Sequence, residues 1–166
     1  MALRNVVTYE QKALYKTSRE VTSFDNRLHT LLDDMADTLY SQNGVGLAAP
    51  QVGVLRRAVI VLETNVPEGE KDILIELINP VIIEAEGSQT GTEGCLSVPG
   101  EYGIVTRPEK VKVRAQDRYG NWFEVEGEGL TARCFCHEID HLEGIIFTDL
   151  AERMLTEEEL ESGEID

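Results

Sequence analysis

Hydrophobic residues recur with helical spacing in an early segment of the chain, from about Ser23 to Gln42. Six of them fall on one face of a helix with 3.6 residues per turn: Phe24, Leu28, Leu31, Leu32, Met35 and Leu39. Ser23 or Asp25 can cap the start of this helix, and Asn43-Gly44 supplies a left-handed stop. The pattern predicts an amphipathic helix with one face against the core.

After Pro50 the chain changes to runs rich in β-branched residues or with alternating polarity, which are typical of strands. Strands are predicted in four segments: Arg57–Glu63, Ile73–Glu84, Lys110–Asp117 and Trp122–Glu126. We expect Asn79-Pro80 to interrupt the second segment and Arg107-Pro108 to mark a further break. The last two strands are separated by a Tyr119-Gly120-Asn121 turn and are therefore predicted to form a hairpin.

A second long helix is predicted from about Thr131 to Glu143, with Gly144 as its stop. Its apolar residues spread over more than one face, which indicates a buried helix. Thr156 to Glu159 form a capping-box pattern that begins a short acidic helix. Because helices and antiparallel strands do not alternate, we predict an α+β fold: one compact domain over residues 1–166, with antiparallel or mixed sheets around the central helix 131–143.

Composition narrows the class of protein. The 166 residues carry a formal net charge of −16, which disfavours binding to nucleic acids. We find no secretory signal and no membrane-length apolar run, so no membrane partner is expected. Three cysteines are too few for a disulfide framework and fit a reducing compartment, so we expect a cytoplasmic protein.

The strongest chemical signal is His137-Glu138-Ile139-Asp140-His141, an H-E-x-x-H pattern on the second predicted helix. In a helix, two residues four apart lie about 40° apart around the axis and about 6 Å apart along it, so both imidazoles can reach one cation. Glu138 lies beside that face, where it can contact a metal-bound water. The remaining histidine, His29, is expected at the surface. The motif predicts a metal site that performs hydrolysis.

A catalytic metal needs a third protein ligand and one open position. Cys134 lies about 10 Å along the helix axis from His141, and Cys136 points about 100° away from His137, so both fit poorly. Cys95 is the remaining cysteine, within the bend Glu93-Gly94-Cys95-Leu96-Ser97-Val98-Pro99-Gly100. Spacing alone does not decide between a metal ligand and a buried structural cysteine at this position.

The segment Gly44-Val45-Gly46-Leu47-Ala48-Ala49-Pro50-Gln51-Val52-Gly53 is also unusual. It formally fits a dinucleotide fingerprint, but that motif needs a preceding strand and a following helix, and here the order is reversed. We interpret the segment as a loop whose glycines let the backbone approach a ligand. Gln51 is then a candidate hydrogen-bond donor to substrate; a plain helix–strand connector is the alternative.

Taken together, the segments GVGLAAPQVG, EGCLSVPG and CHEIDHLEG resemble those of the peptide deformylases, in the same order and at suitable separations. The resemblance extends from about Leu14 to Leu150. It implies a hydrolase that removes the N-formyl group from the formyl-methionine of new polypeptides and releases formate. It also implies Cys95 as the third ligand beside His137 and His141.

The resemblance implies roles for other residues as well. Glu138 is the expected general acid and base, and Gln51 and the backbone N–H of Leu96 are the expected oxyanion donors. Gly46 is expected to pair with the substrate backbone, and Arg107 and Asp140 to orient the site. The expected walls of the methionine pocket are Val45, Leu130 and Cys134.

Expected partners follow from the same resemblance. They are N-formyl-methionyl nascent peptides and one divalent metal, ferrous iron in the cell, with Zn²⁺, Ni²⁺ or Co²⁺ as the other candidates; a Cys/His/His donor set suits all four. Cys136 departs from a common glutamine and adds a thiol expected to be prone to oxidation. Tyr102 departs from a basic residue found in some members. The acidic C-terminal end is unsuited to docking on RNA, so any ribosome contact is expected to be transient.

Two rival interpretations use the same residues. A zinc endopeptidase of the H-E-x-x-H type would need a downstream ligand, and only Asp149 and Glu152 are candidates, in predicted loops. A structural metal site would need four protein ligands, with Cys134 or Cys136 joining Cys95. The helix geometry opposes this second alternative.

Overall fold

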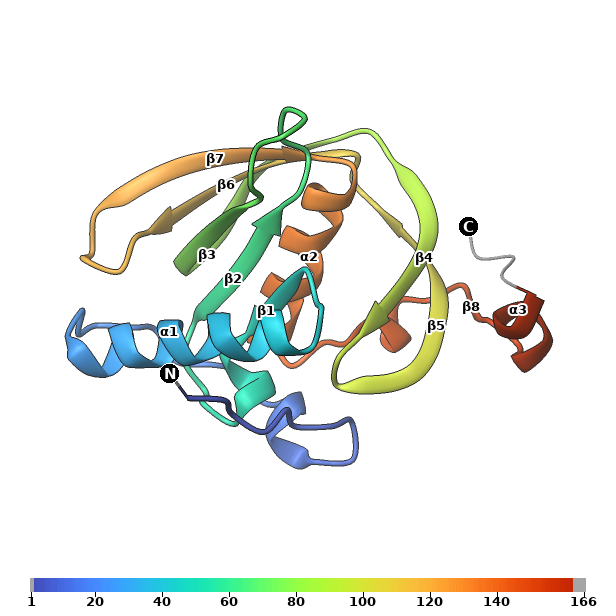
Figure 1. The fold of residues 1–166 in the computed structure, drawn as a ribbon, viewed down its shortest axis with the longest axis horizontal. Helices are drawn as coiled ribbons and strands as arrows, with labels where there is room; N and C mark the ends of the chain where they lie inside the picture. Colours follow the sequence, from blue (N-terminus) through green and yellow to red (C-terminus); the bar gives the residue numbers. More distant parts are fainter. Residues whose placement is uncertain (1, 163–166) are drawn as a thin grey trace.

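Two antiparallel sheets form the frame of the fold, with one helix between them. The computed structural model describes residues 2–162 and places α2 (Leu130–Leu142) between the larger sheet and the hairpin β4–β5 (Figure 1). The five-stranded sheet has the order β1 (Gly46–Ala48), β2 (Ala58–Glu63), β3 (Ile73–Glu86), β6 (Lys110–Gln116), β7 (Trp122–Glu128). The three-stranded sheet has the order β4 (Gln89–Cys95), β5 (Val98–Arg107), β8 (Arg153–Met154). The predicted α+β class is confirmed.

The three predicted helices are present, with small shifts at their ends. The first, α1 (Asn26–Ser41), is capped by Asp25, whose side chain accepts a hydrogen bond from the N–H of Leu28. Asn43 adopts φ of 55° and ends this segment in the left-handed conformation, as the sequence predicts. The last, α3 (Glu157–Ser162), begins after Thr156, which caps it as predicted. None of the helices in residues 2–162 combines the length and apolarity needed to cross a membrane.

Strand β2 is buried on both faces, which explains why its sequence is an almost continuous apolar run. Val59 and Val61 belong to the cluster that includes Phe135 of α2. Ala58 and Ile60 belong to the cluster formed with α1. Since successive side chains of a strand point to opposite faces, β2 separates the two long helices and fixes α2 against the sheet.

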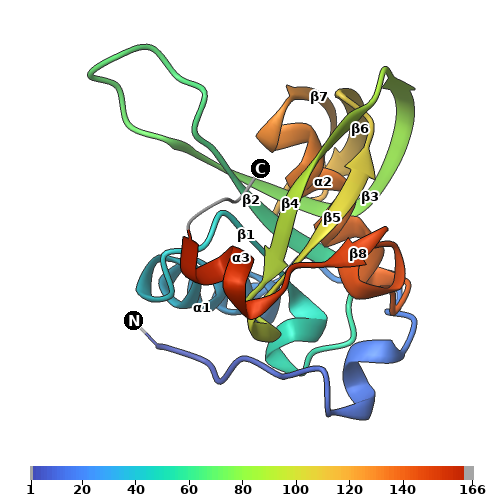
Figure 2. The ribbon, with the colours of Figure 1, turned by 90° about the vertical axis from the view of Figure 1, so that its right-hand side faces the viewer.

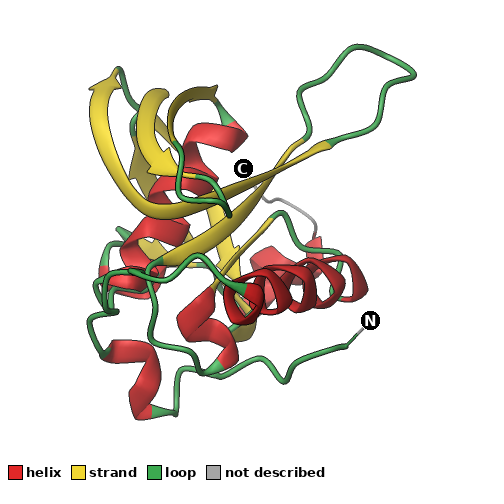
Figure 3. Cartoon of the chain, turned by 90° about the vertical axis from the view of Figure 1, so that its left-hand side faces the viewer, coloured by secondary structure: helices red, strands yellow, loops and turns green. Residues whose placement is uncertain are grey.

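A third apolar cluster lies under the smaller sheet and joins it to the segment after α2. It contains Leu14, Val98, Val105, Ile146 and Phe147. Figure 2 shows β4, β5 and β8 lying together in front of α2. The loop between β2 and β3 projects away from the rest of the chain (Figures 2 and 3). The smaller sheet therefore packs along α2, and near the start of this helix Arg133 donates to the carbonyl of Val105 in β5.

The predicted break at Asn79-Pro80 is wrong, because β3 continues through it. The register with β6 shifts between Ile78 and Val81, so the proline sits in a bulge and its missing N–H removes no regular ladder bond. Asn79 adopts φ of 52°, a conformation that asparagine tolerates. The predicted break at Pro108 is confirmed, since β5 ends at Arg107. Strands β1, β4, β5 and β8 were not predicted.

Replacing Asn79 with alanine is expected to destabilise the fold. The Asn79 side chain is 7% exposed, accepts from the N–H of Val21 at 2.9 Å, and donates to the carbonyl of Val21 at 2.9 Å and to Gln116 at 2.8 Å. Losing these partners from buried groups should cost about 3 kcal/mol and lower the Tm by about 6–12 °C. Thermal unfolding measures it. Gln116→Ala, which removes only one of these bonds, should cost less; an equal loss would contradict the role given to Val21.

Candidate metal centre

The structure brings three ligand-type side chains to one place. The Sγ atom of Cys95 and one ring nitrogen each of His137 and His141 all lie within 4.8 Å of one another. Cys95 ends β4, and the two histidines face it from α2, with ring centroids 5.0 Å apart. The Sγ of Cys95 is 3.3 Å from Nε2 of His141. In residues 2–162, no fourth metal-ligating side chain belongs to this group.

Glu93 holds the first histidine and is the main residue that the sequence analysis missed. Its Oε2 lies 2.9 Å from Nδ1 of His137, which leaves Nε2 free to bind a metal. Glu93 is 5% exposed and also accepts hydrogen bonds from Arg107 and Arg133. Burial pushes the pKa of Glu93 up, but the bonds from His137 and Arg107 prevail and lower it to about 2. Glu93 is therefore ionised.

Arg107 and Asp140 form an ion pair beside this carboxylate. Nη1 of Arg107 lies 2.6 Å from Asp140, and Nη2 lies 2.7 Å from Glu93. The guanidinium group thus joins β5 to α2 and reaches His137 through Glu93. The sequence held one signal for Glu93, its place two positions before the candidate ligand Cys95. Histidine ligands commonly donate their second ring nitrogen to a carboxylate, so an acidic residue near a ligand is a candidate for this role.

Glu138 is buried beside His137 in the metal cluster. It is 4% exposed, its Oε2 lies 4.0 Å from Nε2 of His137, and its Oε1 has no hydrogen-bond partner in the described residues. Burial raises the pKa of Glu138 to about 7, and the adjacent His137 offsets only part of this rise. The carboxylate can therefore take up and release a proton near neutral pH.

Gly46 makes room for this carboxylate. A side-chain carbon added at Gly46 would lie 2.6 Å from Oε2 of Glu138 and 2.9 Å from its Cγ. Gly46 begins β1, which is one of the two edge strands of the larger sheet. The glycine predicted to approach a ligand thus also fits against the candidate general base.

Gln51 approaches the metal cluster from the side of Cys95, not from α2. Its Nε2 lies 3.4 Å from Sγ of Cys95 and 3.2 Å from Oγ of Ser97, and its Oε1 accepts from the N–H of Ala48 at 2.9 Å. The N-terminal segment ties both loops together, because Val7 donates to the carbonyl of Gln51 at 2.6 Å and Tyr9 donates to that of Ser97 at 2.9 Å. These contacts fix the side-chain amide beside the thiol.

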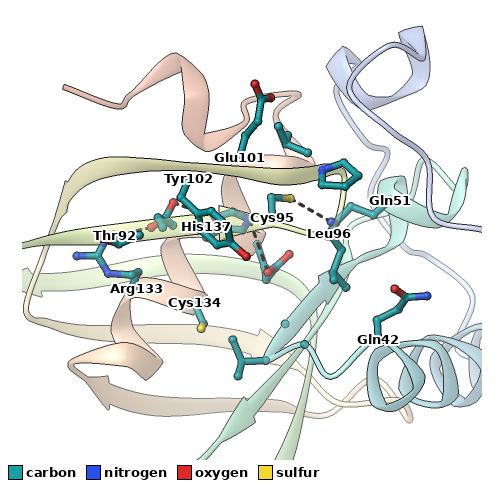
Figure 4. A pocket seen from close by; sticks show the side chains of 18 of the residues that line it. Gln42, Gln51, Thr92, Cys95, Leu96, Glu101, Tyr102, Arg133, Cys134 and His137 are labelled. Carbon is teal, nitrogen blue, oxygen red and sulfur yellow. Dashed lines mark hydrogen bonds and ion pairs between the residues drawn. The ribbon is translucent and has the colours of Figure 1, made fainter. Parts of the chain in front are cut away.

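A cavity of about 510 Å³ opens over the cluster (Figure 4). Nine of the ten residues predicted for the site line it: Val45, Gly46, Gln51, Cys95, Leu96, Leu130, Cys134, His137 and Glu138. The tenth, His141, is fully buried below. Leu130 is 49% exposed and stands at the edge of the cavity. The structure thus assembles the predicted set from three separate segments of the chain, residues 45–51, 95–96 and 130–141.

Other sequence expectations have mixed outcomes. His29 is only partly buried, and its Nε2 lies 2.8 Å from the carbonyl of Arg118. Cys136 is 6% exposed, and burial raises its pKa to about 11. A buried thiol that stays protonated reacts slowly, so the expected sensitivity of Cys136 to oxidation is not supported.

Comparison with known proteins agrees with this geometry. The sequence model of the family described as polypeptide deformylase matches residues 3–157. A peptide deformylase of Caldicellulosiruptor bescii is 57% identical over 161 residues, covering 97% of this chain and 93% of that protein. One of Lachnoclostridium phytofermentans is 55% identical over 152 residues, covering 90% of this chain and 89% of that protein.

Solved structures give the same result. A peptide deformylase from Legionella pneumophila matches with a TM-score of 0.83 at 42% identity, covering 98% of this chain and 92% of that chain. One from Thermotoga maritima matches with a TM-score of 0.83 at 35% identity, covering 92% of this chain and 99% of that chain. The described residues share this fold and the family's sequence pattern extends over nearly all of them, so the chain belongs to the polypeptide deformylase family.

Proposed function

We propose that Cys95, His137 and His141 hold one divalent metal ion and that Glu138 moves the proton during hydrolysis of the formyl group. The protein is a metal-dependent hydrolase of the deformylase family and removes the N-formyl group from nascent polypeptides. The residue assignment rests on one observation: one thiol and two imidazoles meet beside the buried carboxylate of Glu138. The Oε1 atom of this carboxylate has no hydrogen-bond partner in the described residues.

The donor set fits a transition metal. A thiolate with two imidazoles suits iron, zinc, cobalt or nickel, and three protein donors leave a position for water. The hydrogen bond between Glu93 and Nδ1 of His137 supports the fit, because it directs Nε2 toward Cys95. We propose ferrous iron in the cell, with Zn²⁺, Ni²⁺ or Co²⁺ as substitutes. When bound, such an ion supplies Lewis acidity and lowers the pKa of a water molecule.

Glu138 acts as general base and then as general acid in this proposal. The carboxylate accepts a proton from the attacking water and later gives it to the amine that leaves the formyl carbon. Its burial and its raised pKa suit both steps. The free Oε1 is the atom available for this transfer.

Gln51 and Leu96 are proposed to stabilise the negative charge that develops on the formyl oxygen. Nε2 of Gln51 lies beside Cys95, and the Leu96 N–H follows Cys95 directly in the chain. One such donor is typically worth about 3–4 kcal/mol in barrier height. Two donors beside the thiol therefore supply an oxyanion site.

The methionine side chain is proposed to enter the cavity between Val45, Leu130 and Cys134, with the substrate backbone along Gly46. Cys134 is 6% exposed, and burial raises its pKa, so it stays a neutral apolar wall. The partners are formylated nascent peptides in the cytoplasm. We propose that any ribosome contact is transient and that the protein does not bind nucleic acid, because its net charge is −16.

A formate-release assay tests the proposal. Formyl-Met-Ala should release formate, whereas acetyl-Met-Ala and a blocked internal peptide should stay intact. Cleavage of the internal peptide would favour an endopeptidase. Retention of metal without any formate release would favour a structural site.

Gln51→Ala is expected to lower kcat about a hundredfold with a smaller change in KM, because the donor acts mainly on the transition state. Steady-state kinetics on formyl-Met-Ala measures both constants. Ser97→Ala is the matched control, because it removes the hydroxyl 3.2 Å from the Gln51 amide but leaves the donor in place. A Gln51 variant that changes KM alone would show that Gln51 only binds substrate.

A further inference from the structure

Three arginines line one cavity without an acidic partner in the described residues. The sequence contains ten arginines, and six of them form ion pairs with carboxylates. A seventh, Arg114, lies over the Trp122 ring at 4.2 Å. The three that remain are Arg19, Arg27 and Arg56, and all of them line the same cavity. We call it the arginine cavity.

The arginine cavity measures about 650 Å³ and lies between the start of α1, the segment before it and the loop 53–56. Figure 1 shows the start of α1 at the end of that helix away from the β4–β5 hairpin. Within residues 2–162, the arginine cavity shares no lining residue with the cavity over the metal cluster. Its size suits a small molecule, since such sites span about 300–1,000 Å³. Its apolar lining residues are Val21, Leu28, Leu31, Val54 and Leu55.

Backbone hydrogen bonds hold two of the arginines side by side. The N–H of Arg19 donates to the carbonyl of Leu55 at 3.0 Å, and the carbonyl of Arg19 accepts from the N–H of Arg57 at 2.9 Å. Arg19 and Arg56 are therefore opposite each other in a parallel β-bridge, and side chains in such a pair project to the same side. Like charges placed opposite one another on adjacent strands repel. A bound anion would offset this repulsion.

The acidic residues of the arginine cavity do not neutralise its arginines. Glu20 and Asp25 also line it, but in the described part of the chain neither forms an ion pair with them. The Asp25 side chain accepts from the N–H of Leu28 at 3.3 Å and so caps α1. The guanidinium group of Arg56 donates to the carbonyl of Leu55 at 3.3 Å. Most N–H donors of the three guanidinium groups are therefore available to a ligand.

From these observations we infer that the arginine cavity binds a small phosphate monoester whose apolar body packs over Leu28 and Leu31. A guanidinium group matches phosphate oxygens with two parallel hydrogen bonds. A phosphate group offers three acceptor oxygens and about two negative charges, so it suits three arginines better than a carboxylate does. A nucleic acid is disfavoured, because its many phosphates would meet a chain with a net charge of −16. The inference goes beyond the proposed function and does not depend on it.

Phenyl phosphate is the probe, because it joins one phosphate group to one apolar ring. Added to the Zn²⁺-loaded protein at constant ionic strength, it should shift the amide NMR signals of residues 19–28 and 53–56. The signals of Cys95, His137 and His141 report whether it binds at the metal cluster instead. Benzoate lacks the phosphate group and inorganic phosphate lacks the ring, so each should bind about tenfold more weakly.

Variants test the three arginines separately. Arg19→Gln, Arg27→Gln and Arg56→Gln should each weaken the binding of phenyl phosphate about tenfold in calorimetry, because each removes hydrogen bonds to a charged group. Lys71→Gln is the matched control, since it makes the same change in net charge in the exposed loop between β2 and β3. Its affinity should be unchanged. Arg19→Gln should not lower the Tm, because it relieves the repulsion from Arg56.

Several results would overturn the inference while leaving the proposed function intact. One is the absence of shifts in residues 19–28 and 53–56, or shifts confined to the metal cluster. Another is an equal loss of affinity in Lys71→Gln, which would show that net charge alone attracts the probe. Benzoate or inorganic phosphate binding as tightly as phenyl phosphate would also contradict it, as would tighter binding of a single-stranded oligonucleotide. A lower Tm in the arginine variants with unchanged affinity would show a structural role instead.

Discussion

Glu138→Ala is expected to lower kcat about a thousandfold or more while the metal stays bound. Glu138 is not part of the three-residue ligand group, so its loss removes no ligand. Its Oε2 lies 4.0 Å from Nε2 of His137, the ring nitrogen that Glu93 does not contact. Among the described residues that line the cavity, no other side chain is placed to move a proton beside this nitrogen. Without it, the water loses its proton acceptor and the leaving amine its donor.

The measurement is a formate-release assay together with metal analysis of the same preparation. Glu138→Gln is the matched control, because it keeps the shape beside Gly46 and cannot accept the proton; it should be as inactive as the alanine variant. Substantial turnover in either variant with a full complement of metal would contradict the role of Glu138.

Cys95→Ala is expected to weaken metal binding by more than about a hundredfold and to abolish formate release. Residues that merely orient a ligand already contribute 10–100-fold to metal affinity, and a direct ligand should contribute more. Loss of the metal should also lower the Tm, because an ion that binds only the folded protein stabilises it.

Metal content after dialysis and the Tm, each with and without chelator, measure this effect. Cys136→Ala is the matched control, since Cys136 is also a free thiol, buried near the middle of α2, but lies outside the ligand group. It should keep its metal. Stoichiometric metal in Cys95→Ala would refute the ligand assignment, and re-addition of Fe²⁺, Zn²⁺, Ni²⁺ or Co²⁺ to the chelated protein would rank these metals by activity.

The local periodicity of hydrophobic residues predicted much of the fold. Helices α1 and α2 were predictable because their apolar spacing, caps and stops lie within the segments themselves. The hairpin β4–β5 was not, because Gln89–Cys95 contains two glycines and no apolar alternation. Its burial comes from contacts with α2 and with the third cluster, and such contacts leave no local pattern.

The candidate site likewise contains residues that local sequence predicts and residues that it does not. His137 and His141 lie one helical turn apart, so their meeting follows from helix geometry. Cys95 joins them from 46 residues before His141, and spacing alone left it undecided. Glu93 was missed because a carboxylate in a glycine-rich bend looks solvent-exposed until the fold places two arginines and a histidine around it.

That shared carboxylate has a consequence for how the enzyme loses activity. Glu93 accepts bonds from β5 through Arg107, from the start of α2 through Arg133 and from the ligand His137. Heat or denaturant that opens the β4–β5 hairpin would therefore release the His137 imidazole. At the same moment it would leave the buried guanidinium groups of Arg107 and Arg133 without their carboxylate partner. Inactivation and loss of the native hairpin should form one cooperative event, with no long-lived state that is folded but catalytically silent.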